Sequence, residues 1–366
     1  MYGLYFHIPF CKSKCNYCDF ASFPQHMNMQ DDYVDCLIRE LETRKGITAD
    51  TVYIGGGTPS VLSIENTEKL LCAIRNTFTL TNDCEFTVEV NPATVDIQKG
   101  ELYRKYGVNR ISMGAQSFVD SELKTLGRIH TKDDTVHTFK LLRSCGFDNI
   151  NLDLMYALPG QTSESLGVSI DNILALNPEQ ISCYGLKYEE GTPFYEKLKS
   201  GVLTECDEDT FADMYDMVRE RLLQNGYEHY EISNFCTKGM ESRHNIKYWQ
   251  DKDYIGFGLA SSSKEGRRRY THTGDIKEYM ADFRIDEDYT MSEEEYMREF
   301  VILALRVINS GVDKAKFRKK FGVSFDAVFK EQILKTAPYT INTENTFKLK
   351  NEAVLVSNSI MCEFME

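Results

Sequence analysis

The stretch that decides the fold is LYFHIPFCKSKCNYC, residues 4–18. It begins with β-forming residues and passes directly into a loop that contains Cys11, Cys15 and Cys18. The chain has 11 cysteines, an odd number, and the other eight are scattered, mostly among apolar neighbours where a thiol behaves as a small core residue. In a protein without an export signal, clustered cysteines indicate metal ligands instead of disulfides. The sequence therefore predicts a metal site in this loop.

Further β-rich runs follow this first strand, and stretches with apolar residues at helical spacing separate them. The expected strands are residues 4–8, 52–54, 86–90, 110–113, 150–155, 180–184 and 228–232. Such alternation is typical of an α/β fold with a parallel sheet, which right-handed crossovers curl into a partial or full (β/α) barrel. Because barrel chemistry lies at the carboxyl ends of the strands, the cysteine loop is placed where a site is expected.

The alternation stops near residue 235, and we expect three regions. They are a barrel domain over residues 1–235, a connecting segment over 236–290 and a small C-terminal domain over 291–366. Ser292 and Glu295 fit a capping box at the start of the last region. Two more short helical patterns and an alternating stretch at 339–349 then favour a helical, winged-helix-like module.

Charge and hydropathy exclude several classes of protein. A net charge of −14 disfavours binding to nucleic acid, and a local basic cluster fits a solvated helix face. That cluster consists of Lys314, Lys316, Arg318, Lys319 and Lys320. No stretch is long and apolar enough for a transmembrane segment, and the first residues do not resemble a signal peptide. We therefore expect a cytoplasmic protein.

Three thiolates from one loop suit a 4Fe-4S cluster, because they hold three irons and leave the fourth without a protein ligand. An iron of that kind can chelate the amino and carboxylate groups of S-adenosylmethionine. Zinc is an alternative, but it needs a fourth ligand, and the next cysteine, Cys36, falls in a helical pattern. Three unrelated loop thiols are the remaining alternative.

The pattern Cys11-x3-Cys15-x-Tyr17-Cys18, following the strand end HIPF at residues 7–10, resembles the radical S-adenosylmethionine superfamily. More narrowly, it resembles the oxygen-independent coproporphyrinogen III oxidase family, which includes the haem-chaperone branch HemW. The resemblance extends over almost the whole chain. It implies a 4Fe-4S cluster held by Cys11, Cys15 and Cys18, with S-adenosylmethionine as the second cofactor.

Polar motifs at the other strand ends extend this resemblance. Considered alone, the glycine-rich turn at residues 55–60 is as easily structural as ligand-binding, whereas a carboxylate such as Glu89 suits an ammonium group and Arg128 suits a carboxylate. Asp153 could bind ribose hydroxyls, as acidic strand-end residues do in nucleotide-binding folds. The resemblance assigns as cofactor contacts Tyr5, Tyr17, Gly56, Gly57, Thr58, Glu89, Gln116, Arg128 and Asp153.

A second motif, HNIKYW at residues 244–249, resembles the His-Asn-x-x-Tyr-Trp motif of the haem-chaperone branch. An imidazole can ligate haem iron, and tyrosine and tryptophan can lie against a porphyrin face. A lone histidine is more often structural. The resemblance makes His244, Tyr248 and Trp249 candidates for binding haem as a further ligand.

The two branches imply different functions. The oxidase branch typically has a long N-terminal extension and a fourth cysteine two residues after the third, whereas here the first cysteine is Cys11 and that position is Phe20. The chaperone interpretation is therefore preferred, with haem, a haem-acceptor protein and an electron donor as partners. The alternatives are an oxidase that decarboxylates a porphyrinogen, or a radical enzyme with another substrate. One departure is Ser262, where chaperone relatives often have histidine.

Overall fold

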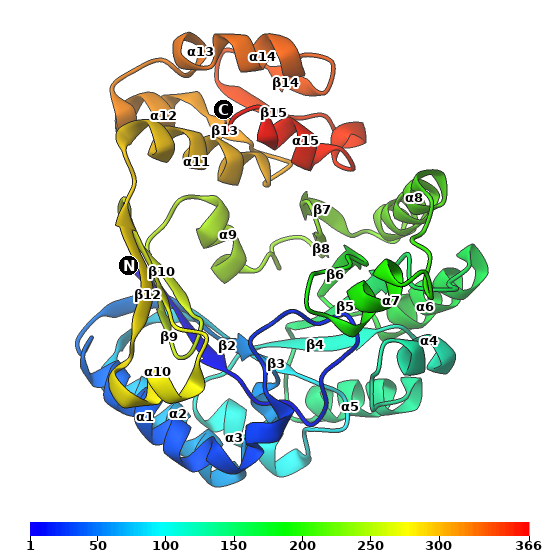
Figure 1. The fold of residues 1–366 in the computed structure, drawn as a ribbon, viewed down its shortest axis with the longest axis vertical. Coiled ribbons are helices and arrows are strands. Elements are labelled where there is room, and N and C mark those ends of the chain that lie inside the picture. The colour runs from blue at the N-terminus through cyan, green and yellow to red at the C-terminus, as the bar shows by residue number, and fades with distance from the viewer. Residues whose placement is uncertain (366) are drawn as a thin grey trace.

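The computed structural model describes residues 1–365, and a single 12-stranded sheet dominates it (Figure 1). The strand order is β12-β11-β10-β9-β1-β2-β3-β4-β5-β6-β8-β7, and the run from β9 to β6 is parallel throughout. The strands are β1 Tyr2–Ile8, β2 Thr48–Gly56, β3 Thr79–Val90, β4 Arg110–Gln116, β5 Ile150–Tyr156, β6 Gln180–Gly185, β7 Glu228–Glu231, β8 Asn234–Cys236, β9 Tyr254–Phe257, β10 Ser262–Glu265, β11 Arg268–His272 and β12 Ile285–Thr290. The curved, open sheet confirms the predicted α/β fold with a partial barrel.

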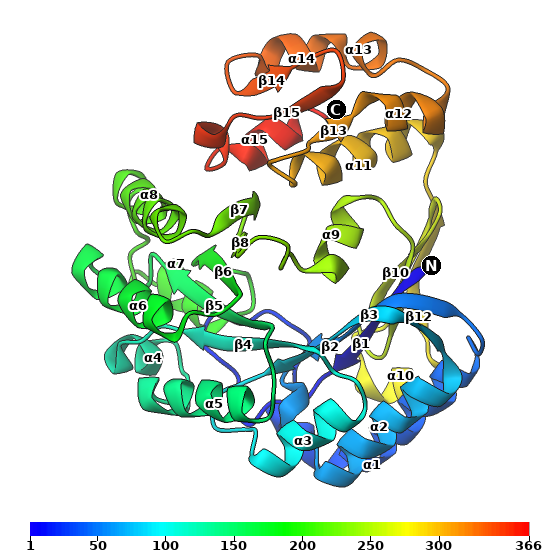
Figure 2. The same cartoon turned by 180° about the vertical axis from the view of Figure 1, so that it is seen from behind.

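Helices cover the outer face of this sheet, as both views show (Figures 1 and 2). They are η1 Pro24–Met29, α1 Gln30–Glu42, η2 Pro59–Val61, α2 Ile64–Thr77, α3 Ile97–Lys105, α4 Asp120–Thr125, α5 Lys132–Ser144, α6 Ser163–Leu176, α7 Pro193–Lys199, α8 Glu208–Gln224, α9 Arg243–Trp249 and α10 Ile276–Asp282. Not all of them do so: α9 lies on the inner side, between the sheet and the C-terminal module, and α7 lies beside the cysteine loop, where Phe194 N donates to Asn16 O at 2.9 Å. None of the helices formed by the described residues is long and apolar enough to cross a membrane.

The two faces of the parallel strands differ in polarity. Leu4, Phe6 and Ile8 of β1 are fully buried in the core beneath the outer helices. Tyr5 and His7 alternate with them and therefore point to the inner face. The same alternation recurs on the following strands, so the inner face of the barrel is lined by polar side chains.

Residues 236–290, expected as a connecting segment, are built into the sheet. Strand β9 pairs in parallel with β1, and β10, β11 and β12 extend the sheet beyond it in antiparallel order. Every residue of β12 is exposed, and its sequence is IDEDYT. An exposed, charged edge strand lacks the apolar alternation by which a strand is recognised, which is why the sequence did not reveal it.

The C-terminal module has a hydrophobic cluster of its own, rich in phenylalanine. Its elements are α11 Glu293–Leu305, β13 Val312–Asp313, α12 Lys314–Phe321, α13 Phe325–Val328, α14 Lys330–Thr336, β14 Thr340–Asn342, β15 Thr346–Leu349, η3 Asn351–Ala353 and α15 Ser357–Cys362. The capping box of Ser292 and Glu295 is present at the start of α11. The expected helices and hairpin are confirmed, and a short strand, β13, completes a three-stranded sheet.

Candidate functional site

The cysteine loop lies at the carboxyl end of β1, in contact with the glycine-rich turn that ends β2. The backbone N–H of Gly57 donates to Ile8 O at 2.9 Å, and that of Thr58 donates to Phe10 O at 2.7 Å. A Cβ added to Gly57 would lie 2.7 Å from Phe10 O and 3.1 Å from Cys11 Sγ. Only glycine allows this close approach, so the turn fixes the position of the loop.

Two of the three thiols lie against hydrogen-bonding side chains from other parts of the chain, one after β2 and one after α4. Cys11 Sγ is 3.3 Å from Thr58 Oγ1, and Arg128 Nη1 donates to Cys15 Sγ at 3.6 Å. Burial raises the pKa of both Cys11 and Cys18. Since metal ligands must be thiolates, donors near the sulfur atoms offset part of this cost.

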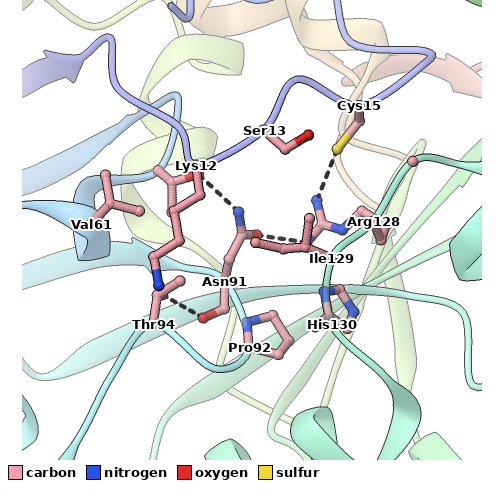
Figure 3. Close-up of a pocket in the computed structure, with 12 residues that line it drawn as sticks. Lys12, Ser13, Cys15, Val61, Asn91, Pro92, Thr94, Arg128, Ile129 and His130 are labelled. Carbon is pink, nitrogen blue, oxygen red and sulfur yellow. Dashed lines mark hydrogen bonds between the residues drawn. The ribbon is translucent and has the colours of Figure 1, made fainter. Parts of the chain in front are cut away.

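Asn91 connects these two arrangements. Its Nδ2 donates to Thr58 Oγ1 at 2.8 Å, and its Oδ1 accepts from Arg128 Nη2 at 2.7 Å. Arg128 Nη2 also donates to Gly114 O at 2.7 Å. Figure 3 shows Asn91 between the cysteine loop and Arg128. Asn91 was not among the expected site residues, although its place directly after a strand end is a usable signal.

A pocket of about 340 Å³, including the solvent at its mouth, opens beside these residues (Figure 3). Of the expected site residues, Cys15, Thr58 and Arg128 line it. Its lining comprises Lys12, Ser13, Cys15, Thr58, Val61, Asn91, Pro92, Thr94, Gly127, Arg128, Ile129 and His130. The pocket brings side chains of the cysteine loop, of the turn after β2 and of the segment after α4 to one opening.

The inner face of the sheet next to the loop carries Tyr5 and His7. His7 Nε2 lies 2.7 Å from Ala21 O, and its Nδ1 lies 3.1 Å from the Tyr5 hydroxyl. Because a carbonyl only accepts, Nε2 carries the proton and Nδ1 accepts from Tyr5. Burial lowers the pKa of His7 to about 4, so the ring stays neutral. The Tyr5 oxygen therefore faces the interior as an acceptor.

Two carboxyl groups lie deeper on the same face. Glu89 accepts from the Tyr53 hydroxyl at 2.7 Å and from Gly56 N at 3.1 Å, and burial raises its pKa to about 7. Asp153 accepts from Asn151 Nδ2 at 2.8 Å, and burial raises its pKa to about 6. Both groups therefore have acidities that respond to ligands near neutral pH.

The two remaining expected cofactor residues, Gln116 and Tyr17, lie beside the inner face of the sheet. Gln116 ends β4 in a left-handed backbone conformation, with φ of 66°, which is uncommon for a residue other than glycine. Its amide lies against Gly114, where a Cβ would come within 2.8 Å of Nε2. Tyr17 lies in the cysteine loop, and burial raises its pKa. The structure thus brings the expected cofactor residues to one end of the barrel.

The haem candidates form a different arrangement on α9. His244 is 1% exposed, its Nδ1 lies 2.9 Å from Thr51 Oγ1, and its Nε2 lies 2.7 Å from the Tyr248 hydroxyl. Its ring stacks on Tyr53 with centroids 5.2 Å apart, and burial lowers its pKa to about 3. Both ring nitrogens are therefore engaged within the protein, and neither is presented to a ligand. Tyr248 and Trp249 are only half-buried.

Ser262 lies away from this arrangement. It is exposed on β10, and its hydroxyl is 3.0 Å from Thr271 Oγ1 on β11. Its side chain therefore contacts the neighbouring strand, not α9.

The metal chemistry of the cysteine loop follows from how the thiols are spaced. Cys11, Cys15 and Cys18 lie close enough for each to influence the charge of the others. Within residues 1–365, however, no three or more His, Cys, Asp or Glu side chains converge on one point as ligands of a single ion would. A cubane binds each thiolate through a different iron, so it does not require such convergence.

Other inner-face residues were not identified from the sequence. Arg110 donates to Thr87 and Gln180, and Asn151 donates to Ser112. The signal was available, because parallel strands in the core of a sheet are usually apolar on both faces. Polar residues at every second position instead indicate a wet or ligand-facing interior.

The fold and the three-cysteine loop define a radical S-adenosylmethionine barrel protein. The profile of the radical SAM superfamily matches residues 5–173, and that of the HemN C-terminal domain matches residues 291–339.

Two relatives named heme chaperone HemW show the family more narrowly. The protein from Lactococcus lactis subsp. lactis is 40% identical, over 90% of this chain and 87% of its own. The protein from Bacillus subtilis is 35% identical, over 100% of this chain and 99% of its own. The chain belongs to the HemW family.

A solved structure confirms the architecture. Coproporphyrinogen III oxidase (HemN) from Escherichia coli superposes with a TM-score of 0.87, covering 99% of this chain and 89% of its own, at 23% identity. At that identity, the match establishes the fold and leaves the activity open.

Proposed function

We propose that this protein binds haem and transfers it to acceptor proteins, using a 4Fe-4S cluster and S-adenosylmethionine as cofactors. The observation that carries the proposal is full-length similarity to a relative named heme chaperone, at 35% identity over 100% of the chain. The proposed partners are haem, a haem-acceptor protein and an electron donor. The proposed location is the cytoplasm, where thiols remain reduced.

The residues of the barrel mouth fit the two cofactors. Cys11, Cys15 and Cys18 would hold three irons, with Thr58 and Arg128 next to two of the sulfur atoms. When bound, the cluster and S-adenosylmethionine supply one-electron radical chemistry. A Cβ at Gly57 would approach Cys11 Sγ, so bare backbone is required exactly where the turn meets the loop.

The polar side chains would orient S-adenosylmethionine by complementary charge. Arg128 Nη2 is anchored on Asn91 and Gly114 and Nη1 donates to Cys15, which holds a positive charge beside the cysteine loop that suits a carboxylate. Glu89, when ionised, and the acceptor oxygen of Tyr5 suit the N–H groups of the amino group of S-adenosylmethionine. Asp153 suits ribose hydroxyls. Gly56, Tyr17 and Gln116 complete the proposed cofactor contacts.

For haem, we propose that α9 contributes the faces of Tyr248 and Trp249, and that His244 holds the helix on the sheet. Ligation of iron by His244 would break its bonds to Thr51 or Tyr248. Losing such bonds leaves buried polar groups unpaired, which costs about 1–3 kcal/mol each. This network supports a structural role for the imidazole in the absence of haem.

Anaerobic reconstitution of the full-length protein tests the function. The reconstituted protein is incubated with haem, passed over a desalting column, and mixed with a haem-requiring apoprotein. In parallel, it is given coproporphyrinogen III with S-adenosylmethionine and a reductant. Retention and transfer of haem without decarboxylation is the expected result. Turnover of coproporphyrinogen III without haem retention would favour an oxidase instead.

A further inference from the structure

Arg306 lies directly after α11, and its Nε is buried without a hydrogen-bond partner. Among residues 1–365 its guanidinium group takes part in no hydrogen bond and no ion pair. Burial lowers its pKa, which reflects the cost of the unpaired charge. Its backbone is fixed, because Arg306 O accepts from Ile232 N at 3.2 Å.

The guanidinium stacks on the second orphaned group. Arg306 Cζ lies 4.2 Å from the ring centroid of Trp249, and Trp249 Nε1 is buried without a hydrogen-bond partner. A guanidinium group that stacks through its face keeps the N–H groups at its edge available, because they point outward in the plane of the guanidinium. Two neighbouring side chains from different parts of the chain thus offer donors and find no acceptor.

The nearest carboxylate does not satisfy them. Glu231 influences the charge of Arg306 but forms no ion pair with it. Its side chain instead accepts from Ser233 N at 3.0 Å and from Asn234 Nδ2. Glu231 is 1% exposed, and burial raises its pKa, which weakens it further as a counter-ion.

Arg306 and Trp249 are near the inner face of the barrel. Helix α9, which ends at Trp249, packs against α11, which ends just before Arg306 (Figure 2). Tyr184 on β6 is close enough to influence the charge of Arg306, and it is 41% exposed. Solvent therefore reaches this neighbourhood from the inner face.

We propose that Arg306 and Trp249 form a binding site for a carboxylate. Resting on the proposed function, the inference goes one step further and assigns the carboxylate to a propionate side chain of haem. The planar edge of the guanidinium matches the two oxygens of a carboxylate, and Trp249 Nε1 adds a third donor. Trp249 then contributes both its N–H and its ring to one ligand.

The test compares haem with haem dimethyl ester, in which both carboxylates are blocked. Each ligand is titrated into the full-length reconstituted protein and followed by Soret absorbance and by fluorescence of Trp249, the only tryptophan of the chain. Arg306→Met should weaken haem binding by about tenfold or more, as expected for a lost charge-assisted hydrogen bond. The affinity for the dimethyl ester should be equal in the wild type and the variant. Arg306→Lys should fall between them, because it keeps the charge and loses the fork.

Arg219→Met is the matched control, since Arg219 on α8 also has a buried Nε without a partner. It should leave both affinities unchanged. Wild-type protein that does not bind haem would refute the proposed function. Wild-type protein that binds haem and the dimethyl ester equally well, or Arg306→Met protein that binds haem as tightly as the wild type, would refute this inference alone. Competition by acetate at millimolar concentration, without discrimination between haem and its ester, would indicate a general carboxylate site and contradict the assignment to haem.

Discussion

The cysteine loop and helix α9 carry the two motifs of this chain, and their polar atoms are arranged in opposite ways. In the loop, Cys11 and Cys15 lie against single donors beside an open pocket. On α9, His244 is enclosed and both of its nitrogens are engaged. The same kind of family motif can therefore present its ligand atoms or sequester them, and only the surrounding hydrogen bonds distinguish the two cases.

The largest effect is expected on iron content, when a cysteine of the loop is replaced. Cys15→Ser removes one of three cluster ligands, so iron and acid-labile sulfide should fall to near background after anaerobic reconstitution. The fold should persist, because the loop lies at the mouth of the barrel. Cys145→Ser is the control, since Cys145 packs against Gly100 far from the loop, and it should retain full iron. Full iron in the Cys15→Ser protein would contradict the assignment.

Replacing His244 on α9 should instead affect the stability of the fold. His244→Ala removes a buried ring together with its bonds to Thr51 and Tyr248, and should lower the free energy of unfolding by about 2–4 kcal/mol. Urea denaturation followed by circular dichroism measures this value, and iron content after reconstitution should stay at the wild-type level. An unchanged unfolding midpoint with lost haem binding would show that His244 is a haem ligand, not a structural residue.

The contrast can be sharpened at Asn91, which orients donors toward both thiols. Asn91→Leu should weaken S-adenosylmethionine binding by about tenfold, because Arg128 loses its anchor. The cluster potential should also become more negative as hydrogen bonding near the sulfurs is lost. Isothermal titration and redox titration measure the two effects. Asn109→Leu is the control, because Asn109 makes two similar bonds, to Phe86 N and Cys84 O, away from the site. If both variants changed the affinity and the cluster potential equally, Asn91 would have only a packing role.

The smallest expected effect concerns pH. Glu89 has a pKa raised to about 7, so it is ionised above that pH and protonated below it. If its carboxylate accepts hydrogen bonds from the amino group of S-adenosylmethionine, affinity should fall by about tenfold between pH 8 and pH 6, one proton being taken up per site. Glu89→Gln should bind more weakly and lose this dependence. A wild-type affinity that is flat over the same range would exclude Glu89 from contact with the amino group.

Much of the fold could be predicted from the sequence, because β1 to β5 each lead into a polar motif after an apolar run. Strands β10 and β12 could not, since SSKE and IDEDYT have no apolar period and form at a sheet edge. For the site, the cysteines were predicted from their clustering and spacing, whereas the glycine-rich turn was assigned only through the resemblance. The bridging role of Asn91 depends on its contact with Thr58, 33 positions away in the sequence. The enclosure of His244 depends on its contact with Thr51, 193 positions away. No local sequence pattern records either contact.

The cluster proposed on Cys11, Cys15 and Cys18 is tested most directly by the metal content of the anaerobically reconstituted protein, combined with its electron paramagnetic resonance spectrum after reduction. We expect about four irons and four sulfides per chain, and a spectrum that changes when S-adenosylmethionine is added. About one zinc or iron per chain without sulfide, or a cluster spectrum that S-adenosylmethionine leaves unaltered, would contradict this expectation.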